Sequence, residues 1–167
     1  MTREGRTCLR VLVAAVFVLP LWSAKLHAGI FRQAKSFSTG GIYNTALVAG
    51  DVNGDGKLDV VVASSGLSDP GTVSILLGDG AGNFTMANTY EVDEATSLAI
   101  SDLNGDGRLD IIAGRFSVGA ALVLLGNGDG SFQTPVVYET GASYTVGVAL
   151  ADLNHDGKLV LVTTNLC

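Results

Sequence analysis

Short apolar runs separated by turn residues fill the chain after residue 40. One stretch contains TALVAGD, LDVVVASS, TVSILLG and FTMANTY, and the next contains TSLAISD, LDIIAGRF, ALVLLG and FQTPVVYE. Each run covers about 5–8 residues, is rich in Val, Ile and Leu, and is bounded by Gly, Asp or Asn, which is typical of β-strands. A sustained helical period is missing after residue 28. The pattern therefore predicts an all-β protein.

The runs belong to a repeat of about fifty residues. The acidic run DVNGDGKLD at 51–59 returns as DLNGDGRLD at 102–110 and, altered, as DLNHDGKLV at 152–160. VSILLGDGAGNF and LVLLGNGDGSF recur in the same phase, and an aromatic residue stands six positions after the Phe of each. Four strands in a unit of this length are typical of a β-propeller blade.

We therefore expect blades of four antiparallel strands in an incomplete propeller of about two and a half blades. The expected units are the last strand of a blade in 29–43, blades in 44–94 and 95–143, and a partial blade in 144–167. Propellers close with about 4–8 blades, so this number predicts either a homo-oligomer or a fragment of a longer coding sequence. The end at LVTTNLC, within a blade, favours a truncated gene product. A single copy would expose strand edges and apolar blade faces.

The first 28 residues have the layout of a secretory signal peptide. Arg3, Arg6 and Arg10 precede the apolar stretch VLVAAVFVLPLW at 11–22, and SAKLHA follows up to Ala28. Crossing a membrane takes about 20 apolar residues, so we expect cleavage and no membrane span in the remaining chain. An uncleaved N-terminal anchor is the alternative. We expect the protein to be extracellular or periplasmic, and a lone remaining cysteine makes no intrachain disulfide.

Acidic side chains outnumber basic ones, 16 to 10 in the whole chain. Residues 1–28 hold four of the basic and one of the acidic side chains, so the remainder carries 6 and 15, a formal charge of −9. This excess disfavours nucleic acid as a partner, because phosphates reward basic patches. Eight of the 15 acids lie in the three acidic runs, where such close like charges repel unless something offsets them. The negative charge therefore predicts cation sites.

Oxygen-bearing side chains alternate along the acidic runs as the ligands of a hard cation do. Positions 1, 3, 5 and 9 would give side-chain oxygens, position 7 a backbone carbonyl, and the Gly at position 6 a sharp left-handed turn. This set favours calcium (Ca2+) over zinc, which prefers His or Cys, and over magnesium, which needs a tight octahedron. The candidate ligands are Asp51, Asn53, Asp55, Lys57 (carbonyl) and Asp59; Asp102, Asn104, Asp106, Arg108 (carbonyl) and Asp110; and Asp152, Asn154, Asp156 and Lys158 (carbonyl).

The third run departs from the other two. Val160 stands at its position 9, so one carboxylate is missing, and we expect weaker calcium binding or none. His155 replaces the Gly at position 4, and we interpret it as a solvated loop residue rather than a ligand.

Three alternative interpretations of these motifs are less well supported. Asp, Asn and Gly favour turns by themselves, but two complete five-ligand matches in register exceed that pattern. An EF-hand or dockerin-like loop needs a ligand at position 12 and a helix after it, whereas Val62 and Ala113 stand there and strand-like runs follow. The glycine-rich GDGAGNF and GNGDGSF do not open onto helices as phosphate loops do, so we expect hairpin turns, with Phe84 and Phe132 in the core between blades.

Taken together, DVNGDGKLDVVVAS, DLNGDGRLDIIAG and LLGNGDGSFQ resemble the FG-GAP/VCBS-type repeats of integrin α-chain propellers and of many bacterial surface proteins. The resemblance covers nearly the whole chain after residue 28. It implies a propeller with calcium held in the loop between the first and second strands of a blade. Carried over to this chain, the ligands are the residues already named, and Val160 departs from the pattern.

These observations predict a secreted, calcium-binding propeller segment that acts as a scaffold for adhesion, with a protein or a glycan as its partner and calcium in a structural role. An enzyme is disfavoured: after residue 28 the only histidine is His155, and no Ser lies in a nucleophile-elbow context. Glu91, Asp93 and Glu94 form an acidic cluster that is typical of a solvated turn. The alternative is a non-catalytic fragment or accessory part of a propeller-containing hydrolase.

Overall fold

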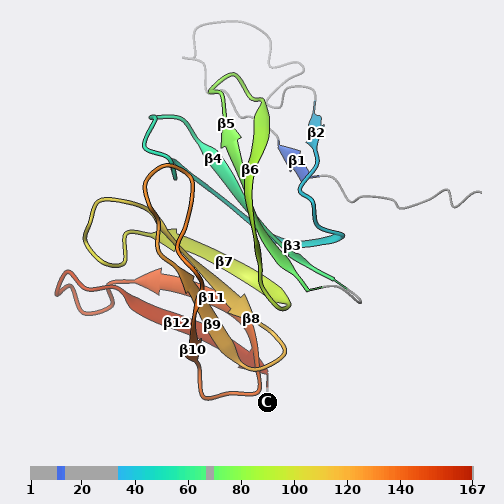
Figure 1. Ribbon diagram of the computed structural model, residues 1–167. Coiled ribbons are helices and arrows are strands. Elements are labelled where there is room, and N and C mark those ends of the chain that lie inside the picture. Colours follow the sequence, from blue (N-terminus) through green and yellow to red (C-terminus); the bar gives the residue numbers. More distant parts are fainter. Residues whose placement is uncertain (1–10, 14–33, 67–69, 167) are drawn as a thin grey trace, which may run out of the picture.

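The computed structural model describes residues 11–13, 34–66 and 70–166. In this part of the chain the regular elements are all β-strands, and no helix could cross a membrane (Figure 1). The strands are β1 (Val11–Val13), β2 (Lys35–Phe37), β3 (Tyr43–Gly50), β4 (Asp59–Ser65), β5 (Thr72–Gly78), β6 (Phe84–Glu91), β7 (Ala95–Ser101), β8 (Asp110–Arg115), β9 (Ala120–Leu124), β10 (Val136–Glu139), β11 (Tyr144–Ala151) and β12 (Val160–Leu166).

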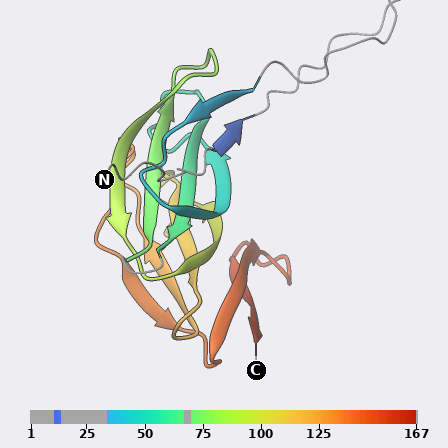
Figure 2. The ribbon, with the colours of Figure 1, turned by 90° about the vertical axis from the view of Figure 1, so that its right-hand side faces the viewer.

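Two four-stranded antiparallel sheets form the body of the molecule. Their strand orders are β3-β4-β5-β6 and β7-β8-β9-β10, each a simple meander in chain order. The pairs β11-β12 and β1-β2 are also antiparallel. Figure 2 shows the first sheet, the second sheet and the β11-β12 pair following one another. The predicted all-β fold, an incomplete propeller built of four-stranded blades, is therefore confirmed; we call the two sheets blade 1 and blade 2.

The second strand of each blade is apolar on both faces because it lies between two other layers. In β4, six consecutive residues from Asp59 to Ser64 are buried. Val60 and Val62 face a cluster with Phe37 and Phe84, whereas Val61 belongs to the cluster between the two blades. Burial on both faces explains a continuous apolar run in place of the alternation seen in β3.

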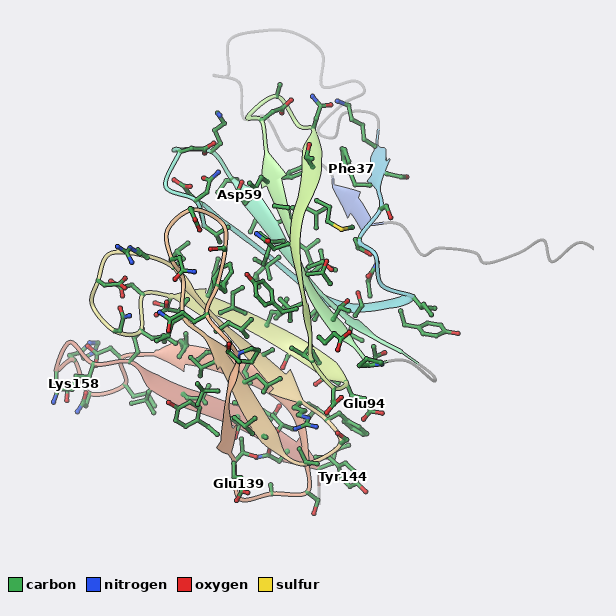
Figure 3. All side chains as sticks on the ribbon, viewed as in Figure 1. Phe37, Asp59, Glu94, Glu139, Tyr144 and Lys158 are labelled. Carbon is green, nitrogen blue, oxygen red and sulfur yellow. The ribbon has the colours of Figure 1, made fainter. Side chains whose placement is uncertain are left out.

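Aromatic pairs repeat the packing of one blade on the next. Phe37 on β2 meets Phe84 edge to face, with ring centroids 5.3 Å apart (Figure 3). Tyr90 on β6 meets Phe132 of blade 2 in the same way at 6.1 Å, and the Phe132 N–H donates to the Tyr90 hydroxyl oxygen at 2.7 Å. Phe132 is buried, as predicted for the core between blades, and Phe84 packs against the neighbouring cluster.

A β-bulge near the start of β3 and another near the start of β7 each carry a hydrogen bond between blades. Thr45, in the bulge of β3, donates its hydroxyl to the Ala95 carbonyl of blade 2 at 2.5 Å. Thr96, in the bulge of β7, donates to the Thr145 carbonyl of β11 at 3.0 Å. Each hydroxyl also lies within hydrogen-bond distance of a carbonyl of its own sheet, Ala63 at 3.2 Å and Gly114 at 3.3 Å, so the bulge places it between the two blades and ties one to the next.

The structure shortens one expected strand and leaves most of the predicted signal peptide undescribed. The run FQTPVVYE was expected to be one strand, but β10 begins only at Val136 because Pro135 has no N–H to donate; Phe132 keeps a single bridge to Gly126. The predicted signal peptide lies outside the described residues apart from Val11–Val13, which pairs with β2. Cys167 also lies outside them.

Candidate metal-binding loops

The three acidic runs form the loops between the first and second strands of successive units. Loop 1 (51–58) joins β3 to β4, loop 2 (102–109) joins β7 to β8, and loop 3 (152–159) joins β11 to β12. All three lie along the same edge of the molecule (Figure 1). A strand follows each loop, which excludes the helix that an EF-hand requires.

Loop 1 is closed by hydrogen bonds from its own backbone to its side chains. The Asp51 carboxylate accepts the Asp55 N–H at 3.0 Å on one oxygen and the Gly56 N–H at 2.8 Å on the other. Asn53 Oδ1 accepts the Asp55 N–H at 3.1 Å, and Asp55 Oδ1 accepts the Lys57 N–H at 2.9 Å. Gly56 has φ +79°, the left-handed conformation expected at position 6. Positions 1, 3 and 5 therefore turn inward together.

Loops 2 and 3 reproduce this arrangement. The Asp102 carboxylate accepts the N–H groups of Gly105 and Gly107, both at 2.8 Å. In loop 3 the Asp152 carboxylate accepts the Gly157 N–H at 2.8 Å. The repetition shows that this loop geometry follows from the sequence motif and not from a particular neighbour.

Hydrogen-bond donors lower the pKa of one carboxyl group in loop 1 and of one in loop 2. The Lys57 backbone N–H, and then the Lys57 ammonium group 3.1 Å from Asp55 Oδ2, lower the pKa of the Asp55 carboxyl. The Gly107 N–H is the main cause of the lowered pKa of Asp102. Asp55 in loop 1 and Asp102 in loop 2 therefore present ionised oxygens at neutral pH, as a cation site requires.

The aspartates at position 9 have an environment that sequence reasoning missed. Asp59 and Asp110 are fully buried. Asp59 accepts the Val52 N–H at 3.0 Å on Oδ2 and the Gly78 N–H at 2.8 Å on Oδ1, so it joins the start of loop 1 to the end of β5. Asp110 makes the matching bonds to Leu103 at 2.9 Å and to Gly126 at 2.8 Å. The available signal was an Asp that opens an otherwise apolar strand.

The candidate ligand set has the chemistry of a calcium site but is not gathered around one point. By chemistry it fits calcium, because every side chain at positions 1, 3, 5 and 9 of loops 1 and 2 offers oxygen. An oxygen that accepts one N–H also keeps a second lone pair. By geometry, the described residues contain no group of three or more Asp, Glu, His or Cys side chains gathered closely enough to hold a metal. The ligand assignments, including the carbonyls of Lys57, Arg108 and Lys158, therefore stay predictions.

Loop 3 differs from the other two at two positions. Val160, in place of the buried aspartate, is 43% exposed, so the bond from position 9 to the loop backbone is absent. His155 has φ +60°, which is strained for a residue with a Cβ, whereas Gly54 and Gly105 hold the same position at +73° and +77°. His155 is exposed, in line with its interpretation as a solvated residue.

The glycine-rich segments are hairpin turns, as expected. The turn between β5 and β6 is closed by the Asp79 N–H, which donates to the Asn83 carbonyl at 3.1 Å. Asp79 Oδ1 accepts the N–H groups of Ala81 at 2.7 Å and Asn83 at 3.0 Å. These N–H groups already donate to Asp79 within the turn, and a strand, β6, follows the turn. A phosphate-binding loop, which needs free N–H groups at the start of a helix, is therefore excluded.

Comparison with known proteins identifies a family for the repeat. No curated protein matches the sequence. The family described as FG-GAP-like repeat matches twice, over residues 51–113 and 102–163. Each match begins at position 1 of an acidic run and ends in the second strand of the next unit, and repeats of this family form propeller blades. The two matches span more than half of the chain, which therefore belongs to the FG-GAP-like repeat family.

Proposed function

We propose that this chain is a secreted, calcium-stabilised propeller scaffold that binds a protein or a glycan and has no catalytic role. The observation that carries the proposal is the repeated closure of loops 1 and 2 around inward-turned oxygens. Secretion is supported by the layout of the first 28 residues. The absence of a catalytic role is supported by the described histidine, His155, which is exposed on a loop with no nucleophile beside it in the sequence.

Calcium would be held by the residues at alternate loop positions. In loop 1 these are the side-chain oxygens of Asp51, Asn53, Asp55 and Asp59 with the Lys57 carbonyl, and loop 2 has the same set. The ion supplies positive charge that offsets the mutual repulsion of the carboxylates. The chain's own contribution is to fix the turn beforehand, through the N–H groups of positions 5 and 6. Binding then adds to the folding free energy, because the unfolded chain lacks the site.

The test is thermal unfolding of the full chain in excess calcium and in EGTA. The double variant Asp55→Asn/Asp106→Asn removes one charged oxygen ligand from each of loops 1 and 2. An Asn oxygen can still accept the N–H bonds that these residues accept from Lys57 and Arg108, both at 2.9 Å, so the metal-free protein loses only exposed contacts of the second oxygen, from Lys57 Nζ at 3.1 Å and from Asn104 Nδ2 at 3.0 Å. The matched control is Asp129→Asn, because Asp129 accepts the Ser131 N–H at 2.9 Å in a turn outside the acidic runs.

We expect calcium to raise the melting temperature of the wild type and of the Asp129→Asn control equally. At a free calcium concentration one hundred times its Kd, one site adds about 2.7 kcal/mol to the free energy of unfolding. The double variant should melt close to the wild type in EGTA, because only exposed contacts are lost, and should lose most of the calcium-induced rise. An unchanged wild-type melting temperature, or a full rise in the double variant, would remove the calcium role from the proposal.

A further inference from the structure

The two ends of the blade series expose apolar positions that are buried elsewhere in the repeat. On β12, Val162 is 39% exposed, although its repeat equivalent on β4, Val61, is fully buried. On β3, Leu47 is 45% exposed, although its equivalent on β7, Leu98, is 8% exposed. The difference lies in the neighbours and not in the sequence, because the equivalent residues are all apolar.

The exposed residues form one face at each end. The tail face consists of Ala149, Leu153, Val160, Val162 and Leu166 on β11, loop 3 and β12. The head face consists of Leu47 and Ala49 on β3, beside the cluster that Phe37 covers. Val160 adds to the tail face in the place where the other units have a carboxylate, which makes this face more apolar than a plain repeat would be.

The chain already contains the interface that would join these faces. Between blades 1 and 2, one buried cluster unites Val52 and Val61 of blade 1 with Leu98 and Ile111 of blade 2. Leu153 and Val162 on the tail face are the repeat equivalents of the first two residues. Leu47, on the head face, is the equivalent of Leu98. The tail face therefore has the pattern of one side of a known contact, and the head face has the pattern of the other.

The missing strands are complementary as well. The β11-β12 pair corresponds to the first and second strands of a blade. On the head side, β2 occupies the place of a fourth strand, since Phe37 lies on Phe84 as Tyr90 lies on Phe132. β2 thus supplies a fourth strand, which the β11-β12 pair lacks. The apolar faces carry this argument, because β2 lies beyond the predicted cleavage position and stays in the chain whether or not the first 28 residues are removed.

We propose that the tail face of one copy packs on the head face of a second copy, and that two copies close a ring. Each copy contributes two whole sheets and, to the two shared blades, the β11-β12 pair at its tail and β2 at its head, so a pair has four whole and two shared blades. Six blades lie within the range of about 4–8 at which propellers close. The contact is head to tail, and a closed pair contains it twice. This inference does not rest on the proposed calcium role.

The test is the molar mass of the full chain, expressed with its own N-terminus and measured by light scattering in calcium and in EGTA. We expect twice the mass of one chain in both conditions. Val162→Glu on the tail face and Leu47→Glu on the head face should each lower the mass two-fold, with an unchanged β-sheet circular dichroism spectrum. Val118→Glu is the control, because Val118 is 52% exposed in the turn between β8 and β9 of blade 2, which contributes to neither face, and should leave the pair intact.

Mixing the two face variants separates this arrangement from misfolding and from other dimers. A Val162→Glu copy keeps an intact head face, and a Leu47→Glu copy keeps an intact tail face, so their mixture should form one contact and recover the doubled mass. A face-to-face dimer of like surfaces would not be recovered. A wild type of single-chain mass, an aggregate of mixed masses, or a mixture that stays at single-chain mass would overturn the proposal.

Discussion

Replacing Asp59 with Asn separates the structural role of the position 9 carboxylate from any role in metal binding. Asp59 is fully buried, and its two oxygens accept N–H groups from Val52 at 3.0 Å and from Gly78 at 2.8 Å. Asn has one acceptor oxygen, so one of these bonds survives. The other N–H then faces the Asn amide N–H2 group, and two donors oppose each other without a partner.

The cost follows from the bond that is lost. A hydrogen bond to a charged group contributes about 1.5–3 kcal/mol, and a buried donor left unpaired costs about 1–3 kcal/mol. We expect Asp59→Asn to lower the free energy of unfolding by about 3 kcal/mol, which for a chain of this length lowers the melting temperature by roughly 6–12 °C. Asp110→Asn should behave alike, because its bonds to Leu103 and Gly126 have the same geometry.

Guanidinium unfolding in the presence of EGTA measures this cost without any contribution from calcium. Asp55→Asn is the matched control: it makes the same chemical change in the same loop, but its bond from the Lys57 N–H can persist and only the exposed ion pair with the Lys57 ammonium group is lost, so its unfolding free energy should change little. The reasoning fails if either buried aspartate variant loses less than about 1 kcal/mol, or if the control loses as much as they do.

Two further predictions concern other turns. Gly119→Ala should destabilise more than Gly141→Ala in the same unfolding assay. Both glycines have positive φ, at +57° and +75°, but a Cβ at 119 would lie 1.7 Å from a backbone carbonyl oxygen whereas a Cβ at 141 meets nothing within 4 Å; equal losses would contradict the packing argument. Hydrogen bonds from Asn83 lower the pKa of Asp79 to about 2. The unfolded chain therefore binds this proton first as the pH falls below 3.8, so the stability from Asp79 is present above that pH and disappears as the pH falls through 2. An NMR titration with a midpoint near the ordinary value would contradict it.

The blades could be predicted from the sequence because the same pattern of apolar runs and acidic loops occurs in each unit. The runs around Val61 and Ile112 are apolar and in phase with the acidic loops, so strand type and order could be predicted together. The limits of β10 could also be traced to one residue, Pro135, once the ladder was known. The sequence pattern predicts which residues form strands, but it does not predict which strand faces are covered by a neighbouring blade.

The loops were harder to predict because chemically identical residues have different partners. Asp55 and Asp59 stand four positions apart in one motif, yet Asp55 bonds to Lys57 in its own loop and Asp59 to Gly78, 19 residues away. Spacing within a motif cannot reveal a bond to the end of a distant strand. The left-handed conformation at His155 was likewise hidden, because the Gly in the other loops could adopt it without strain.

The blade-on-blade order has a consequence for how this molecule opens. Blade 2 has packed layers on both sides, with β3 and β11 both lying against β7, whereas the β11-β12 pair has one such layer. A series of this kind behaves as a one-dimensional chain whose elements are held by nearest-neighbour terms. Amide protons should therefore exchange last in β8 and first in β12, because local unfolding begins at the β11-β12 end and extends from there to blade 2. Any contact that caps the tail would slow exchange several strands away, without touching them.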